Sequence, residues 1–428
     1  MTDYGASTGT IRVPGPARGA LPWIIWIAGA FTYLVAIVGR SSLAGLGTDM
    51  AVRFDAGSST LALFTTLQLM VYGVMQIPAG LLLDRWGARV IGTVGMLTMA
   101  GGSLWLAFAP DVPSAILARL LTGAGDALIF PSVLRLIALW LPAKRVPVLQ
   151  QITAQFGQLG QVLSVVLLTS LAHGIGWESA FAAVAGVFVV FAVLDALIIR
   201  ERGRPVAAEG RPRPRQLALV AAALREPGTR LGFWIHFVTP FAGTAFALLW
   251  GIPFLMAGEG LSRDAAAGLV TVFVLSGAVF APLMGMLSAA HPGRRPLIAL
   301  GSVAAQAVAL AAVLITPGEA PLWLLVVWVV TLSSGGAASM IAFDVVRRDN
   351  PLSRLSTATG VVNMGGFIAA LVLVYVIGVV LDLQGADPAA YTRDQLRLAM
   401  SATFALWMVG AIGVGIESRA RRRAHGAY

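Results

Sequence analysis

Long apolar stretches separated by short polar segments run through almost the whole chain. A membrane span needs about 20 apolar residues, and twelve stretches approach or exceed that length. They lie at residues 21–45, 57–83, 88–109, 112–141, 145–171, 176–200, 229–256, 263–290, 295–315, 319–346, 354–382 and 393–418. Because backbone groups in hydrocarbon need internal partners, each stretch is predicted to be a helix. The pattern therefore predicts an all-α membrane protein with twelve transmembrane helices.

Composition agrees with this prediction and excludes several classes of protein. The chain is 57% hydrophobic and 12% charged, whereas a soluble domain carries about 25% charged residues. It has no cysteine, which excludes disulfides and thiolate chemistry. The sequence shows no phosphate loop, nucleophile–base pair or metal-ligand cluster. We therefore expect no enzyme, no cofactor, no metal site and no coupling to ATP.

The arginines predict an orientation in the membrane. Alternate loops carry Arg85 and Arg89, the run Arg200 to Arg215 and the run Arg419 to Arg423, whereas the opposite loops are mostly acidic. The positive-inside rule then places both termini in the cytoplasm, for a protein of the inner membrane. The net charge of +10 follows from this bias and from contact with anionic lipids. Nucleic acid is therefore not an expected partner.

One long polar interruption divides the chain. Residues 201–228 are predicted to form a cytoplasmic linker, with a short amphipathic helix at 215–226, between six-helix halves at 1–200 and 229–428. Two similar halves favour a transporter with its substrate site at their interface near the middle of the membrane. No segment resembles a selectivity filter, which disfavours a channel. We expect a monomer that binds a small-molecule substrate and protons.

A charged loop between the second and third stretches is the strongest motif. It reads Gly80-Leu-Leu-Leu-Asp84-Arg85-Trp86-Gly87-Ala88-Arg89. Gly80 suits a close helix approach, and Gly87 suits a tight turn. This loop resembles the signature of the major facilitator superfamily, which implies two pseudo-symmetric six-helix bundles and a gating role for Gly80, Asp84, Arg85, Gly87 and Arg89. The alternative is a loop that only fixes orientation.

Ionisable residues inside apolar stretches are costly and are therefore candidates for function. Tyr33 and Arg40 lie seven residues apart in the first stretch, and Arg119 and Asp126 lie seven apart in the fourth. Seven residues are almost two helical turns, so each pair shares a helix face, about 10 Å apart along the axis. This spacing places the cationic side chains of Arg40 and Arg119 at similar depth in the membrane, with the carboxylate of Asp126 below them.

The fourth stretch carries a second resemblance. The segment from Arg119 through Gly123 and Gly125 to Pro131 resembles a superfamily motif, and the ends of this stretch and of the sixth are similar to organic-anion:cation symporters. That resemblance implies that Arg40 binds an anionic substrate and that Arg119 and Asp126 couple it to protons. The chain departs from the pattern at Gly39, where an acid is frequent, and at Asp126, where glutamate is more usual.

Other interpretations of these residues remain open. Asp126 could serve only to neutralise Arg119, and Arg40 could extend toward lipid headgroups. Gln151, Gln155 and Gln158, which share a face of the fifth stretch, could line the substrate cavity or bond between helices; Gln155 and Gln158 are predicted substrate contacts. Asn363 is predicted to be a polar substrate contact beside a close helix crossing. His236 is either a packed side chain or a proton relay.

Three functions follow as hypotheses. The first is proton-coupled transport of a small organic anion, a carboxylate or a sugar acid, with Arg40, Arg119 and Tyr33 as predicted substrate contacts, because two arginines can bind a carboxylate in bidentate fashion. The second is export of a drug or metabolite by proton antiport, which the segment Gly157-Gln-Leu-Gly-Gln161 disfavours because it lacks the proline of such antiporters. The third is a receptor on the same fold, which nothing in the sequence requires.

Overall fold

The computed structural model describes residues 19–42, 46–55, 64, 67–68, 70–201, 216–386 and 391–425, and the elements assigned to them are all helices. The first group of helices comprises α1 Leu21–Arg40, α2 Gly47–Arg53, α4 Gln76–Ala107, α5 Val112–Asp126, α6 Ile129–Trp140, α7 Val146–Ile175 and α8 Trp177–Ile198. The second comprises α10 Pro227–Val238, α11 Phe241–Ala245, α12 Gly251–Pro253, α13 Arg263–Ala290, α14 Arg295–Ile315, α15 Leu322–Ser339, α16 Ile341–Asp349, α17 Leu355–Leu383 and α18 Arg393–His425. The second group also contains two π-helical segments, η1 Phe246–Trp250 and η2 Phe254–Gly258, and two 3₁₀ turns, η3 Pro292–Arg294 and η4 Leu352–Arg354. Helix α9 Gln216–Arg225 precedes this group.

Eleven of the predicted spans are present as helices long and apolar enough to cross a membrane within the described residues. The predicted span at 57–83 lies partly outside those residues, and its last part forms the beginning of α4. The helix expected at 215–226 is found as α9. The linker residues 202–215 lie outside the described part of the chain, so the predicted division into halves stays a prediction.

The charged loop is a turn of a single residue. Helix α4 runs through Arg85 and Trp86, breaks at Gly87 with φ 80° and ψ 168°, and resumes at Ala88. A positive φ of this kind is costly for any residue with a Cβ, which explains the glycine. The predicted tight turn at Gly87 is therefore confirmed, although helix extends further into the motif than the apolar pattern indicates.

Two spans are interrupted at matching places in the two groups. The fourth span is α5 and α6, which are separated at Ala127 and Leu128, and the tenth is α15 and α16, which are separated at Met340. Pro131 lies in the first turn of α6, where its missing N–H removes no helix bond. The buried acid Asp126 is consequently the last residue of a helix and not the middle of one.

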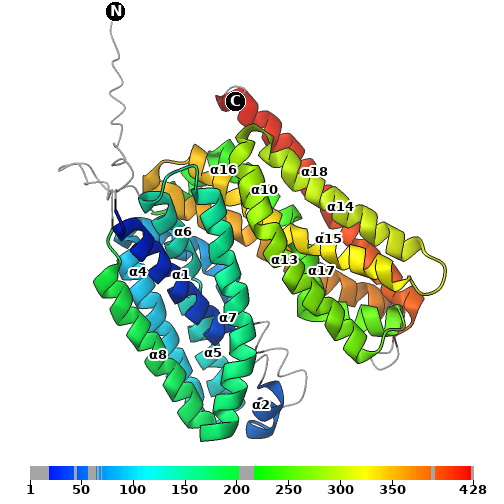
Figure 1. The fold of residues 1–428 in the computed structure, drawn as a ribbon, viewed down its shortest axis with the longest axis horizontal. Helices are drawn as coiled ribbons and strands as arrows, with labels where there is room; N and C mark the ends of the chain where they lie inside the picture. The colour runs from blue at the N-terminus through cyan, green and yellow to red at the C-terminus, as the bar shows by residue number, and fades with distance from the viewer. Residues whose placement is uncertain are drawn as a thin grey trace, which may run out of the picture.

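Figure 1 shows the two groups of helices meeting near α6, α10 and α16 and diverging toward the end that carries α2. Between the groups, α4 packs against α17 and α7 packs against α13. At the diverging ends the ion pairs of the described residues stay within one group, as in Arg53–Glu178 and Arg397–Glu259. The molecule is thus closed on one side, and its two groups separate toward the other.

Candidate functional site

The last residues of two helices form a buried ion pair. Arg40 ends α1 and Asp126 ends α5, and Nε of Arg40 donates to Oδ2 of Asp126. The Asp126 side chain is 1% exposed and that of Arg40 is 19% exposed. The guanidinium also lies over the ring of Tyr72, with 4.1 Å from Cζ to the ring centroid. Two charges in a low-dielectric interior are thereby held as a pair, which limits the cost of burying them.

Two polar atoms of the ion pair have no hydrogen-bond partner in the part of the chain that the structure describes. Nη2 of Arg40 and Oδ1 of Asp126 are buried and have no hydrogen-bond partner among the described residues. Unpaired polar atoms of this kind are uncommon in folded proteins and carry a free-energy cost. The arrangement therefore offers one donor to a ligand and one acceptor to a proton.

Arg119 does not pair with Asp126 in this structure. Its Nη1 donates to Oγ of Ser42 at 2.8 Å, and its Nη2 donates to the carbonyl of Arg40 at 2.9 Å. Further bonds run to the carbonyl of Gly39 and to Oε1 of Gln68. The Asp126 carboxylate forms its ion pair with Arg40, so a neutralising role of Asp126 toward Arg119 stays a prediction. Arg119 instead donates to carbonyls in the last turn of α1, where a helix leaves its C=O groups without helical partners.

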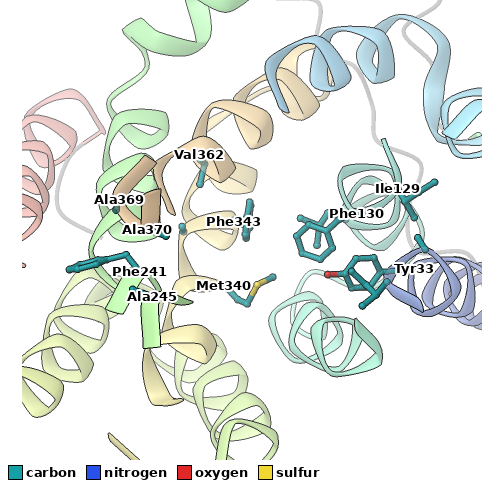
Figure 2. Close-up of a cluster of buried hydrophobic side chains, with 14 of the residues drawn as sticks. Tyr33, Ile129, Phe130, Phe241, Ala245, Met340, Phe343, Val362, Ala369 and Ala370 are labelled. Carbon is teal, nitrogen blue, oxygen red and sulfur yellow. The ribbon is translucent and has the colours of Figure 1, made fainter. Parts of the chain in front are cut away.

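Tyr33 lies two turns before Arg40, on the closed side of the ion pair. Its ring is 4.9 Å from that of Phe130, which in turn is 6.0 Å from Phe343 of the second group. Figure 2 shows Tyr33 and Phe130 facing Phe343 and Met340 across the boundary between the groups. Tyr33 thus lies near the ion pair and packs against Phe130.

The predicted glutamines divide between two environments. Gln151, on the same face, donates to the carbonyl of Ala337 at 2.6 Å and so bonds the two groups together. Gln155 and Gln158 line an open, mostly apolar groove of about 350 Å³ between α7 and α13. No contact of either with Arg40 or Asp126 is found among the described residues. A substrate role for Gln155 and Gln158 stays a prediction.

Asn363 forms a bond between the groups. Its Nδ2 donates to Oε1 of Gln76 at 2.7 Å, in the crossing of α17 and α4, and both side chains are buried. One turn away, the rings of Tyr72 and Phe367 lie 4.9 Å apart. In this conformation Asn363 therefore joins α17 to α4, and its predicted contact with substrate stays a prediction.

The loop motif locks the closed side through a single carboxylate. Oδ1 of Asp84 accepts from the N–H of Ser356 at 3.0 Å, and Oδ2 accepts from the N–H of Thr357 at 2.8 Å. These N–H groups belong to the first turn of α17, where a helix favours negative charge. Gly80 makes the approach possible, since an added Cβ would lie 2.8 Å from Cα of Thr357.

Arg135 extends this lock to the end of the sixth span. Its Nη1 donates to Asp84 at 3.0 Å and to Oγ of Ser356 at 3.0 Å, and its Nε donates to Glu201 at 2.9 Å. Glu201 also accepts from the N–H of Ala88 at 2.8 Å, directly after the Gly87 turn. Arg85 and Arg89 are exposed and lie outside this network. We call Asp84, Arg135, Glu201, Ser356 and Thr357 the gate network.

Several residues of the site escape the sequence analysis. Glu201 belongs to the predicted linker, and Gln68, Tyr72 and Gln76 belong to the apolar stretch at 57–83. A sequence pattern could have identified the residues of the stretch at 57–83, because every fourth position carries one of them or a residue of the loop motif: Gln68, Tyr72, Gln76, Gly80 and Asp84. That spacing places polar groups along one stripe of an otherwise apolar helix.

Asp84→Asn is expected to weaken the gate network and slow transport. Losing the charge at the start of α17 costs about 1–2 kcal/mol, a five- to thirtyfold change in the ratio of closed to open conformations. Spin labels at Lys144→Cys and His291→Cys, in a chain without other cysteines, report the separation of the two groups on the closed side. We expect longer distances and slower turnover.

Arg85→Gln is the matched control, because Arg85 belongs to the same loop but lies outside the gate network. It should leave the distance distribution unchanged. Identical distances and turnover in Asp84→Asn and the unsubstituted protein would reduce the motif to a signal for topology.

A family model and several solved structures match most of the chain. Residues 29–374 match the model of the family described as Major Facilitator Superfamily. The proton:xylose symporter bound to 6-bromo-6-deoxy-D-glucose superposes with a TM-score of 0.69 at 15% identity, over 95% of this chain and 96% of that one. The Escherichia coli fucose:proton symporter superposes with a TM-score of 0.66 at 15% identity, over 93% of this chain and 99% of that one.

Sequence relatives match over shorter segments. A probable sulfoacetate transporter of Cupriavidus necator is 23% identical over 40% of this chain and 39% of its own length. The D-galactonate transporter of Escherichia coli O6:H1 is 25% identical over 38% of each chain. A quinolone resistance transporter of Acinetobacter baumannii is 32% identical over 26% of each. The matched segments thus span about two fifths or less of these relatives.

Proposed function

We propose that this chain, a membrane transporter that belongs to the major facilitator superfamily, moves a small organic anion across the bacterial inner membrane by alternating access coupled to protons. The resemblance of its loop and span-4 motifs to that superfamily is confirmed by the family match. Relatives named as transporters of sulfoacetate and D-galactonate support an anionic substrate.

The observation that carries this proposal is the Arg40–Asp126 pair with its unpartnered Nη2 and Oδ1. A substrate carboxylate that binds Arg40 competes with Asp126 for the guanidinium. A buried carboxylate that loses its cation is stabilised by taking up a proton. The substrate anion and the proton are therefore loaded together, and the pair re-forms when both leave.

Alternating access follows from the gate network in the same proposal. If the arginine-rich loops face the cytoplasm, the structure is closed toward the cytoplasm and its groups separate toward the outside. Opening the other way requires Asp84 to leave the first turn of α17 and Asn363 to leave Gln76. The orientation is tested by a reporter fused after Tyr428, which should report the cytoplasm; a signal from the outside contradicts it.

Export of a drug is the second candidate, because one relative is named a quinolone resistance transporter. Uptake into proteoliposomes, measured across a panel of carboxylates with and without a pH gradient, separates the two. Anion accumulation that rises when the outside is made acidic supports the proposal. Accumulation of ethidium-like cations, with no transport of any carboxylate, contradicts it and favours the exporter.

A further inference from the structure

Five aromatic rings lie around the Arg40–Asp126 pair and on its closed side. They come from both groups of helices, and we call them the aromatic floor: Tyr33, Tyr72, Phe130, Phe343 and Phe367. Tyr72 touches the guanidinium itself, at 4.1 Å from Cζ to the ring centroid. The ring of Phe367 is 4.9 Å from Tyr72, and Phe130 bridges Tyr33 and Phe343.

The aromatic floor lies on the closed side of the Arg40–Asp126 pair. Phe130 follows Asp126 by four residues, about one turn toward the closed side, and Tyr33 precedes Arg40 by two turns. Figure 2 shows Tyr33 and Phe130 directed toward Phe343 across the boundary between the groups. If an anion binds Nη2 of Arg40, the aromatic rings therefore lie between that anion and the gate network.

Amide side chains near the pair are already engaged with the protein. Gln68 accepts from Arg119 and donates to the carbonyl of Arg40, and Gln76 accepts from Asn363 and donates to the carbonyl of Tyr72. Within the aromatic floor, the polar atoms are the phenol oxygens of Tyr33 and Tyr72. A substrate with several hydroxyl groups would leave most of them without a partner after desolvation, and such mismatches are strongly rejected by protein sites.

From this arrangement we propose that the transported anion is a carboxylate with an apolar, ring-bearing body and not a polyhydroxylated sugar acid. The carboxylate binds Arg40 in place of Asp126, and the body packs on the aromatic floor, where offset or edge-to-face ring contacts are favourable. This inference rests on the proposed function and narrows its substrate class.

The test compares three probes with the same head group by calorimetry on the purified protein. Phenylacetate carries a ring, gluconate carries hydroxyl groups, and acetate carries neither. We expect phenylacetate to bind at least about tenfold more tightly than gluconate or acetate. Phe367→Leu, at a half-buried position of the aromatic floor, should remove most of that preference and leave acetate unchanged.

Phe404→Leu is the matched control, because Phe404 is a half-buried ring on α18 that packs on Trp407. It should leave the preference intact, and thermal unfolding checks that both variants fold. Gluconate binding as tightly as phenylacetate overturns the inference while an Arg40-dependent anion site survives. Binding of none of the three, or phenylacetate binding that Arg40→Ala leaves unchanged, overturns the proposed function as well.

Discussion

Asp126→Asn is expected to retain substrate binding and exchange but to lose accumulation driven by a proton gradient. Asparagine resembles the protonated acid in shape and charge, and it leaves the Arg40 guanidinium free for the anion. One pH unit supplies about 1.4 kcal/mol per proton, so the unsubstituted protein should accumulate a substrate about tenfold for each coupled proton. The variant should only equilibrate it. Counterflow and pH-driven uptake in the same vesicles separate these two activities.

Asp195→Asn provides the control for this result. Asp195 is also a buried carboxylate of the first group, and its Oδ1 accepts from Oγ1 of Thr32 at 2.8 Å. It lies outside the Arg40–Asp126 pair, so its removal should leave pH-driven accumulation intact. The reverse pattern, with coupling lost in Asp195→Asn and kept in Asp126→Asn, would move the proton site to Asp195.

Arg40→Ala is expected to weaken anion binding by at least about thirtyfold, or about 2 kcal/mol, which is the lower range for removing one partner of a desolvated charge pair. Arg40→Lys should recover only part of this loss, because an ammonium keeps the charge but not the planar fork. Calorimetric titration of the purified variants measures both effects.

The double variant Arg40→Ala with Asp126→Asn separates binding from folding. Arg40→Ala alone leaves Asp126 buried without its cation, which can destabilise the protein by itself. The double variant removes both charges, so its thermal unfolding should return toward that of the unsubstituted protein while binding stays weak. Normal anion affinity in the double variant would show that Arg40 does not bind the substrate.

The sequence predicts where the helices of this protein lie better than it predicts which side chains pair between them. Apolar stretches identify the spans because hydrocarbon imposes a minimum length, and Gly87 identifies the turn because few other residues adopt its φ. The position of Arg40 and Asp126 within apolar stretches also marks them as functional. These conclusions need only local information along the chain.

Pairing between spans depends on packing, which spacing along one helix does not reveal. Arg119 and Asp126 share a helix face, yet the partner of Asp126 is Arg40, 86 residues earlier. Arg119 instead donates hydrogen bonds to the carbonyls of Gly39 and Arg40 at the buried end of α1. Asn363 and Gln76 meet across 287 residues, and Glu201, assigned to the linker, enters the gate network because α8 ends beside the Gly87 turn.

Proton uptake on substrate binding tests most directly whether anion and proton meet at the Arg40–Asp126 pair. The purified protein is mixed, in weakly buffered detergent solution with a pH indicator, with the carboxylate it binds most tightly. The unsubstituted protein should take up about one proton per bound anion, so the pH of the medium rises, and Asp126→Asn should bind the anion with no change in pH. Equal proton uptake by both proteins, or none by the unsubstituted protein, would contradict the proposed exchange.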